Sequence, residues 1–309
     1  MIDYLIGVDG GTGTRVRVAR TARAGGGEVA HGAGGPSGLA LGAGNAWDAI
    51  QATVAAAFAQ AGIAQPPLAR IAIGLGLPGV HNKRWAAEFV AADPGYAALV
   101  LETDAYACLL GAHEGAPGAI VALGTGSVGK ALYPDGRRRT VGGWGFPAGD
   151  EAGGAWIGLR AVSHIQQVLD GRREPGAFAD ALIAHCGGSR DALQIWLGQA
   201  AETDYAALVP LVLEYATAYT TAHAGTHAAD PVARAILLDA GQEAGNIARA
   251  LDPDGTLPLA LCGGLGAALR DYLPQGLSSR ATVPRGDAAA GALRLIARHL
   301  DIHPIEPRR

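Results

Sequence analysis

One local pattern occurs twice in this chain: an apolar strand, a turn of glycines and hydroxyl residues, and a second strand. In the first copy, "YLIGVDGGTGTRVRVAR", Tyr4–Val8 is predicted to be a buried strand, and the alternation of Val and Arg predicts a half-buried strand at Thr14–Arg20. In the second copy, "GAIVALGTGSVGKALY", the turn Gly124–Ser127 corresponds to Gly11–Thr14. We interpret the repeat as an internal duplication with a boundary near Gly115–Gly118. Chance similarity between two short turns is the alternative.

Outside the two copies, helical and strand patterns alternate, as in α/β proteins. Helices are predicted at Asn45–Ala61, Lys83–Ala92, Ala105–His113, Trp156–Leu169, Ala177–Ala184, Asp204–Asp230, Pro231–Ala250 and Asp287–His299. Strands are predicted at Arg70–Leu75 and Leu99–Glu102, and Leu259–Leu269 is predicted to form a strand, a glycine turn and a helix start. Asn45 is the expected N-cap of the first helix.

The composition limits the classes of function. Of the 309 residues, 49% are apolar and 17% are charged, so the chain can bury the cores of two domains. The formal net charge is −4, and no run of Lys and Arg suggests a phosphate-binding stripe. Arg137–Arg139 follow Pro134–Gly136 and are expected at a solvated hairpin tip. We therefore expect no nucleic-acid partner.

The N-terminus and the cysteines favour a cytoplasmic protein. The segment "MIDYLIGVDGG" has no basic region, and its apolar run is too short for a signal peptide. No apolar run is long enough to span a bilayer, so we expect no membrane association. Cys108, Cys186 and Cys262 are far apart and odd in number, which argues against metal-ligand pairs and a disulfide framework.

Two phosphate-binding motifs fit only in part. Gly124–Lys130 matches G-x-x-x-x-G-K, but Ala131 follows where a P-loop has Ser or Thr, and a hairpin signal follows in place of a helix. Gly74–Gly79 matches G-x-G-x-x-G, but Pro78 interrupts the place where a dinucleotide fold starts its helix. We reject the first motif and expect the second to be a tight turn that lines a pocket.

The duplicated turns remain as the candidate phosphate site. Their glycines let the backbone approach phosphate oxygens, and Thr12, Thr14, Thr125 and Ser127 add hydroxyl donors. Asp9, at the end of the first strand, is positioned to hold Mg²⁺ through water. The alternative for Asp9 is a turn residue that bonds its own backbone. Neither turn contains Lys or Arg, so we expect a divalent cation to neutralise a bound triphosphate.

Five segments in this order resemble a known superfamily: GVDGGTGT, ETDA, ALGTGS, GGWGFPAGDE and LCGGLGAAL. Together they resemble the sugar kinase, heat-shock chaperone and actin superfamily of ATPases. Within it they look like the family of N-acetylglucosamine kinases and 2-hydroxyacyl-CoA dehydratase activators, on the bacterial amino-sugar kinase side. The resemblance implies an α/β fold of two ribonuclease-H-like domains around a cleft. We place these domains at 1–115 and 116–309, with the C-terminal helix 287–299 a candidate to pack back onto the first.

The same resemblance implies roles for individual residues. ATP is expected on two phosphate loops and an adenosine motif, made of Gly10, Gly11, Thr12, Gly13, Thr14, Gly124, Thr125, Gly126, Ser127, Gly263, Gly264 and Gly266. Asp104 of ETDA is expected to be the general base, and an N-cap role for the helix that follows is the alternative. Mg²⁺ is expected at Asp9. The sugar is expected to contact Asp104 and a wall made of Ser37, Pro78, Gly79, Gly143, Trp144 and Asp150. We also expect a homodimer.

Two departures from the family pattern affect these assignments. The first loop places hydroxyls three and five residues after Asp9, whereas relatives usually have one four residues after it. Many relatives carry a sugar-binding Asn after Gly-Pro-Ser, where this chain has Gly38. Ser37 or a water is the expected substitute for that side chain.

Three functions are consistent with these residues. The first is an ATP-dependent kinase that phosphorylates the 6-hydroxyl of an amino sugar such as N-acetylglucosamine or glucosamine. The second is an activator ATPase that drives electron transfer, which needs cysteines for a shared cluster. The third is a non-catalytic sugar sensor, disfavoured by the intact Asp9, Asp104 and Asp150.

Overall fold

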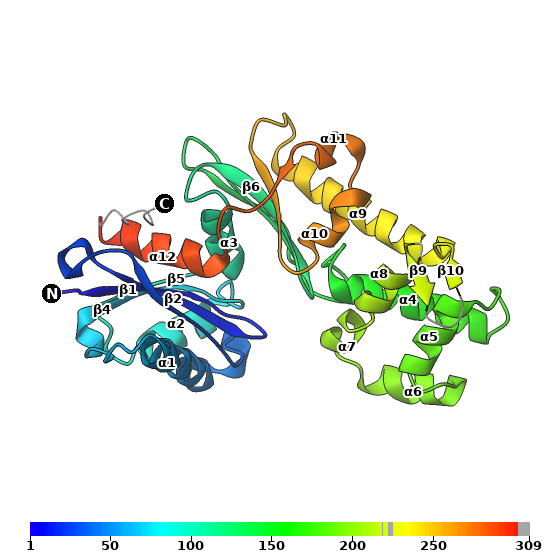
Figure 1. Cartoon of the computed structure of the whole chain (residues 1–309), viewed down its shortest axis with the longest axis horizontal. Coiled ribbons are helices and arrows are strands. Elements are labelled where there is room, and N and C mark those ends of the chain that lie inside the picture. The colour runs from blue at the N-terminus through cyan, green and yellow to red at the C-terminus, as the bar shows by residue number, and fades with distance from the viewer. Residues whose placement is uncertain (218, 222–224, 302–309) are drawn as a thin grey trace. The chain divides into compact units, whose positions relative to one another are not determined.

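The computed structural model describes residues 1–217, 219–221 and 225–301, and the chain forms two compact units (Figure 1). The first unit comprises Met1–Gly118 and the stretch that begins at Val283, and the second comprises Ala119–Thr282. The domain boundaries expected from the sequence remain a prediction. Each unit is built on a five-stranded sheet.

The sheet of the first unit has the strand order β3-β2-β1-β4-β5. Its strands are β1 (Tyr4–Asp9), β2 (Thr14–Arg20), β3 (Glu28–Gly34), β4 (Ile71–Gly76) and β5 (Ala98–Glu102). β1, β4 and β5 are parallel, whereas β2 runs antiparallel to β1 and to β3. The short turn after β1 explains this pairing, because a tight connection joins antiparallel strands.

Helices cover both faces of this sheet: α1 (Ala43–Gln60) and α2 (Lys83–Ala91) lie on one side, and α3 (Asp104–Ala112) and α12 (Ala288–His299) lie on the other (Figure 1). Alternate residues of β1 serve the two faces. Ile6 and Val8 join the α1 core, and Leu5 joins a second cluster with Ile296 of α12. Short 3-10 turns lie at Ala22–Ala24, Leu39–Leu41 and Leu68–Arg70.

Glycines allow α12 to approach the sheet backbone to backbone. Gly7 of β1 and Gly74 of β4 are register partners on the face that α12 covers. A Cβ on Gly7 would lie 2.1 Å from the carbonyl oxygen of Ala289, and one on Gly74 would lie 2.1 Å from that of Ala292. Real Cβ atoms do not tolerate such distances, so this packing requires glycine at both positions.

The second unit repeats the arrangement, with the strand order β12-β11-β6-β7-β8. Its strands are β6 (Gly118–Leu123), β7 (Ser127–Leu132), β8 (Arg138–Gly142), β11 (Leu259–Cys262) and β12 (Ala281–Thr282). β11 is parallel to β6 and to β12, and β7 is antiparallel to β8. Read from β8, this order corresponds to that of the first sheet, which confirms the predicted duplication. The tip between β7 and β8 contains Pro134–Gly136, as the hairpin signal predicted.

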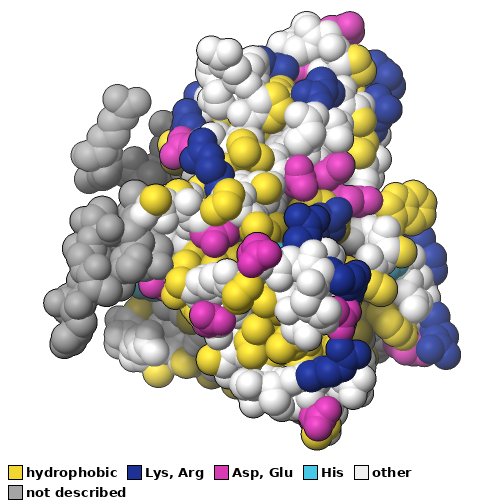
Figure 2. Space-filling view, turned by 90° about the vertical axis from the view of Figure 1, so that its right-hand side faces the viewer, with side chains coloured by type: hydrophobic (Ala, Val, Ile, Leu, Met, Phe, Trp, Pro, Cys, Tyr) yellow, Lys and Arg dark blue, Asp and Glu magenta, His cyan; other side chains and the backbone are white. Residues whose placement is uncertain are grey.

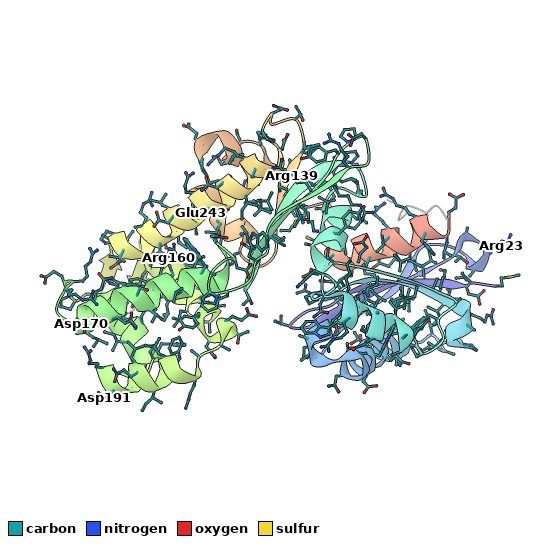
Figure 3. All side chains as sticks on the ribbon, turned by 180° about the vertical axis from the view of Figure 1, so that it is seen from behind. Arg23, Arg139, Arg160, Asp170, Asp191 and Glu243 are labelled. Atoms are coloured by element: carbon teal, nitrogen blue, oxygen red, sulfur yellow. The ribbon has the colours of Figure 1, made fainter. Side chains whose placement is uncertain are left out.

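The helices of the second unit are α4 (Gly154–Leu169), α5 (Ala177–His185), α6 (Arg190–Gln199), α7 (Glu202–Ala206), α8 (Val209–Tyr215), α9 (Pro231–Leu251), α10 (Gly266–Leu269) and α11 (Gln275–Ser278). A 3-10 turn lies at Arg270–Tyr272. Arg160 of α4 lies over the ring of Trp156, near Glu243 of α9 (Figure 3). Burial lowers the pKa of Arg160, and Asp239 and Glu243 oppose that shift.

The structure corrects two predicted elements. The single helix expected at Asp204–Asp230 is instead α7, α8 and a pair of strands, β9 (Tyr219–Thr221) and β10 (Gly225–His227). Threonines and tyrosine in this stretch favour strands, and Pro210 fits only the first turn of a helix. The predicted N-cap Asn45 lies inside α1, whose N-cap is Gly42, and its side chain donates to the carbonyl oxygen of Leu41 at 2.9 Å.

Basic and acidic side chains are interspersed among apolar ones on the face that Figure 2 draws. Arg137–Arg139 are exposed at the start of β8 and the tip before it, as predicted. Across the described ranges, none of the helices combines the length and the hydropathy that a membrane crossing requires.

The glycine contacts predict an asymmetric effect of two Gly→Ala substitutions. Gly74→Ala is expected to lower the free energy of unfolding by about 1–3 kcal/mol, because the methyl group overpacks the contact with α12. Gly44→Ala in α1 meets nothing within 4 Å and is expected to be neutral or to stabilise by up to about 1 kcal/mol. Urea denaturation followed by tryptophan fluorescence measures both. Equal stability of the two variants would contradict the close-packing account.

Candidate active site

The carboxyl ends of three parallel strands lie in register in the first unit. Asp9, the last residue of β1, pairs with Gly76 of β4, and Gly76 pairs with Glu102 of β5. In α/β sheets, ligands bind beyond such carboxyl ends. The segments that follow these strands contain the first loop (Gly10–Thr14), the turn at Pro78 and Gly79, and Asp104. The structure therefore brings together the predicted site residues of this unit.

The first loop is bonded to β4 at its base, and its tip is exposed. The Gly10 amide donates to the carbonyl oxygen of Gly76 at 2.9 Å, and a Cβ on Gly10 would lie 2.4 Å from both a methyl of Leu77 and the hydroxyl of Ser37. Thr12 and Gly13 are exposed. Glycine at position 10 thus lets the loop sit close to the neighbouring turn while its tip faces solvent.

The hydroxyl of Thr14 has a different environment from that of Thr12. It bonds the carbonyl oxygen of Gly35 at 2.6 Å and Oγ of Ser37 at 2.7 Å. Thr14 is 1% exposed, and Ser37 is completely buried. Ser37 also donates its amide to the carbonyl oxygen of Gly11 at 3.2 Å. These contacts tie the first loop to the Gly35–Gly38 segment.

Gly35–Gly38 in turn contacts the turn after β4. The Leu39 amide donates to the carbonyl oxygen of Pro78 at 3.2 Å. Gly79 has φ +92°, which favours glycine, and a Cβ there would contact Leu39 and Trp85. Gly38 has φ −65° and ψ 145°, an extended conformation that any residue can adopt. The predicted sugar-wall residues of the first unit are therefore neighbours.

Asp104 is the first residue of α3, but it is not the helix cap. The N-cap is Thr103, whose hydroxyl accepts a hydrogen bond from the Tyr106 amide at 3.2 Å. The carboxylate of Asp104 accepts one from the Ala105 amide at 2.9 Å. The structure therefore gives the capping role to Thr103 and not to Asp104.

The Asp9 carboxylate has a strongly raised pKa. Burial raises the pKa of Asp9 from 3.8 to about 6, Arg15 opposes the shift, and Asp104 and Asp287 add to it. Nη1 of Arg15 lies 3.5 Å from the Asp9 carboxylate. The mutual influence of Asp9 and Asp104 indicates that two carboxylates share this edge of the sheet, where a cation would favour their ionised forms.

In the second unit, the second loop (Gly124–Ser127) docks on the start of α4. The amides of Gly154 and Ala155 donate to the carbonyl oxygens of Gly124 and Thr125, at 2.8 and 2.9 Å. The Ser127 hydroxyl donates to the carbonyl oxygen of Glu151 at 2.5 Å, and Ser127 is 4% exposed. The first amides of α4 therefore fix the loop backbone.

The glycine-rich segment Gly142–Glu151 folds against the second loop. Gly142, Gly143 and Gly145 have positive φ, which glycine adopts without strain. The Gly145 amide donates to the Asp150 carboxylate at 3.2 Å, and a Cβ on Gly126 would lie 2.2 Å from that carboxylate. Burial raises the pKa of Asp150, and amide hydrogen bonds oppose the shift. Trp144 is 87% exposed.

The predicted adenosine motif begins beside the end of β6. Gly263 has φ +81°, and a Cβ there would lie 2.3 Å from the carbonyl oxygen of Leu123, the residue before the second loop. The Leu265 amide donates to the same oxygen at 3.0 Å. Gly264 has open space around it, and Gly266 begins α10. The motif and the second loop are thus neighbours in this unit.

Neither partial motif forms the phosphate-binding structure whose pattern it matches in part. Lys130 lies in β7, and its Nζ donates to the hydroxyl of Thr140 at 2.8 Å, so it extends along a strand pair and not from a helix. Gly74 and Gly76 are buried in β4, and the next helix begins only at Lys83.

The sequence reasoning missed three residues that shape the site. Thr103 was a readable signal, since Thr before a helix is a common N-cap. Arg15 was placed only on the exposed face of β2, and its pairing with Asp9 depends on the register between strands. Ala152 has φ 68° while fully buried, a conformation that alanine rarely adopts and that the sequence does not signal.

Comparisons with known proteins relate almost the whole chain to a family of ATPases and kinases. A family model described as the BadF/BadG/BcrA/BcrD ATPase family matches residues 6–244. Glucosamine kinase GspK of Vibrio cholerae is 30% identical over 293 residues, which are 94% of this chain and 95% of that protein. A solved structure from Chromobacterium violaceum, described as a candidate N-acetylglucosamine kinase, is 51% identical, with a TM-score of 0.89 over 96% of this chain and 99% of that chain. A related structure from Porphyromonas gingivalis, at 14% identity, shares the fold, with a TM-score of 0.66 over 98% of this chain and all of the other.

The environment of Asp9 predicts that the stability of the chain depends on the charge of the Asp9 carboxylate. Asp9→Asn is expected to raise the free energy of unfolding of the ligand-free chain by about 1–3 kcal/mol at pH 7.5, because a one-unit pKa shift corresponds to about 1.4 kcal/mol. The raised pKa makes the native state bind the proton more tightly, so the gain is full above about pH 6 and disappears as the pH falls below 3.8. Urea denaturation at several pH values measures it. The exposed Asp48→Asn is the control, and an equal gain there would contradict the account.

Proposed function

The chain belongs to the BadF/BadG/BcrA/BcrD ATPase family, and on this premise we propose that it is a kinase that transfers the γ-phosphoryl group of ATP to the 6-hydroxyl of an amino sugar. Glucosamine and N-acetylglucosamine are the proposed acceptors, after the activities for which its relatives are named. The membership confirms the resemblance that the five sequence segments suggested. A cytoplasmic homodimer remains part of the proposal.

The observation that carries the proposal is the position of Asp104. It stands at the carboxyl edge of the sheet, where its charge raises the pKa of Asp9 at the end of β1, while Thr103 caps the helix. A carboxylate at this place can accept the proton of a sugar hydroxyl as that hydroxyl attacks the γ-phosphorus. Asp104 is therefore the proposed general base.

Phosphate binding is assigned to the loop tips. Thr12 is exposed and Thr125 half-buried, and the glycines beside them place no side chain between a ligand and the loop backbone. The Gly263–Gly266 turn, next to the second loop, is proposed to hold the adenosine.

Asp9 is proposed to hold Mg²⁺, whose charge would neutralise the phosphates during transfer. Within the described part of the chain, no group of three or more His, Cys, Asp or Glu side chains is arranged to hold a metal. A single carboxylate suits Mg²⁺, which usually keeps several waters and binds substrate phosphates. The partly buried Asp9, which gains from a neighbouring cation, fits that role.

The sugar contacts are assigned to side chains that present polar or flat surfaces. The Asp150 carboxylate can accept hydrogen bonds from sugar hydroxyls, and the exposed Trp144 ring offers an apolar face beside Gly143. In the first unit, Gly38, Pro78 and Gly79 form the proposed wall, and the buried Ser37 supports it from behind.

A coupled assay of ADP release tests the proposal. The purified chain, with ATP and Mg²⁺, is given a panel of hexoses, amino sugars and N-acetylated sugars. ADP release that rises at least about tenfold with glucosamine or N-acetylglucosamine supports it. A rate of ATP hydrolysis that no sugar changes would favour the activator alternative. Sugar binding without ADP release would favour the sensor.

Asp104→Asn separates the catalytic role of the side chain from a structural one. The amide cannot accept the proton, so kcat is expected to fall by about 10²–10⁴. Stability is expected to change little, because the cap is Thr103, whereas Thr103→Ala is expected to cost about 1 kcal/mol. Steady-state kinetics and urea denaturation measure the two effects. Near wild-type kcat in folded Asp104→Asn would refute the assignment.

Gly38→Asn tests the proposed sugar wall. The backbone accepts a side chain there, and its Cβ would lie 3.3 Å from Pro78, a close but tolerable contact. The added amide is expected to lower the sugar KM by about 2–10-fold, the equivalent of one net hydrogen bond. Gly38→Ala, which adds the Cβ without the amide, is the matched control and should not lower KM. An unchanged KM in folded Gly38→Asn would place this residue away from the sugar.

A further inference from the structure

Thr14 and Ser127 occupy equivalent positions in the two units, at the first residue of the strand that follows each loop. We propose that both are positioning residues and not phosphate ligands. Each holds its loop against the sugar-recognition segment of its own unit, and sugar binding thereby strengthens nucleotide binding. The inference rests on the proposed function, because it takes Gly35–Gly38 and Gly142–Glu151 as the sugar-recognition segments.

In the first unit, the link runs through a buried pair of hydroxyls. The Thr14 hydroxyl lies 2.6 Å from the carbonyl oxygen of Gly35 and 2.7 Å from Oγ of Ser37. The amide of Ser37 closes the ring by donating to the carbonyl oxygen of Gly11. Displacing Gly35–Gly38 therefore breaks bonds of the first loop, and fixing that segment fixes the loop.

In the second unit, one hydroxyl makes the corresponding link. The Ser127 hydroxyl donates to the carbonyl oxygen of Glu151, which directly follows Asp150. The Asp150 carboxylate packs on Gly126 of the second loop. A sugar held by Asp150 would therefore restrain the segment that Ser127 bonds.

Burial separates these two hydroxyls from their neighbours in the loops. Thr14 and Ser127 are 1% and 4% exposed, whereas Thr12 is exposed and Thr125 half-buried. A hydroxyl has one proton to donate, and in both residues a protein acceptor lies within bonding distance. A phosphate oxygen could reach Thr14 or Ser127 only by breaking the link described above.

The consequence is a coupling between the two ligands that does not depend on direct contact between them. A sugar that orders the recognition segments lowers the conformational cost of ordering the loops for the nucleotide. By linkage, the nucleotide raises sugar affinity by the same factor. Without the links, each ligand binds as it does alone, and the factor falls toward one.

The test measures the Kd of a non-hydrolysable ATP analogue with Mg²⁺, in the absence and presence of saturating glucosamine, for the full chain. In the wild type, glucosamine is expected to lower this Kd by about 5–150-fold, the usual range for coupled sites. In Thr14→Val and Ser127→Ala, the Kd without sugar is expected to stay within about twofold of wild type, while the effect of glucosamine falls to less than about twofold. Thr14→Ser, which keeps the hydroxyl, is expected to keep the coupling.

Thr21→Val is the matched control. Thr21 follows the other end of β2, is 6% exposed, and its hydroxyl donates to the carbonyl oxygen of Ile2 at 3.2 Å. The Thr21→Val variant loses a comparable hydrogen bond at the end of β2 remote from the first loop. It should keep the wild-type coupling. If Thr14→Val does not fold, Thr14→Ala removes the same hydroxyl and gives the same readout.

Two results overturn the inference. A Kd without sugar that rises about tenfold or more in Thr14→Val and Ser127→Ala, with coupling intact, would make these hydroxyls phosphate ligands. Coupling that is absent in the wild type, or unchanged in both variants, would show that they transmit nothing. The ADP-release assay of the wild type reports separately on the proposed function. If the coupling fails while that assay succeeds, the sugar kinase proposal still stands.

Discussion

The first unit depends on the backbone-to-backbone approach of α12 to β1 and β4. Gly7 and Gly74 leave no side chain between sheet and helix, and carbonyl oxygens of α12 take the place that Cβ atoms would fill. The last described helix is thereby fixed on the first strand of the chain. The carboxyl ends of β1, β4 and β5 are held in register on this support, and that register places Asp9 and Asp104 at one edge.

At the same edge, a carboxylate of the proposed site is buried at an electrostatic cost to the stability of the chain. Asp9 is largely withdrawn from water, beside a second carboxylate, and Arg15 compensates it only in part. A buried charge of this kind destabilises the ligand-free chain, and a bound cation offsets that cost because it favours the ionised carboxylate. Asp104 stands at the start of α3 but is not its N-cap, because Thr103 is the N-cap. Local conflicts of this kind are expected at functional sites.

The features that the sequence predicted are local or repeated, and those it did not predict depend on distant partners. The two strand–turn–strand copies carry their own period and turn residues, so the duplicated sheets and the two-domain α/β class followed from them. The helix expected at Asp204–Asp230 was wrong because apolar spacing was weighed above the strand preference of Thr and Tyr. Which hydroxyls of the loops are buried was not predictable, since Thr14 bonds Ser37, 23 residues away.

We propose that this chain transfers the γ-phosphoryl group of ATP to the oxygen of the 6-hydroxyl of an amino sugar. The most direct test is ³¹P–¹H correlation NMR of the product formed from glucosamine, ATP and Mg²⁺. The account predicts a new phosphomonoester whose phosphorus couples to the two protons on carbon 6. A phosphorus coupled to the proton on carbon 1, or inorganic phosphate as the sole product besides ADP, would contradict it.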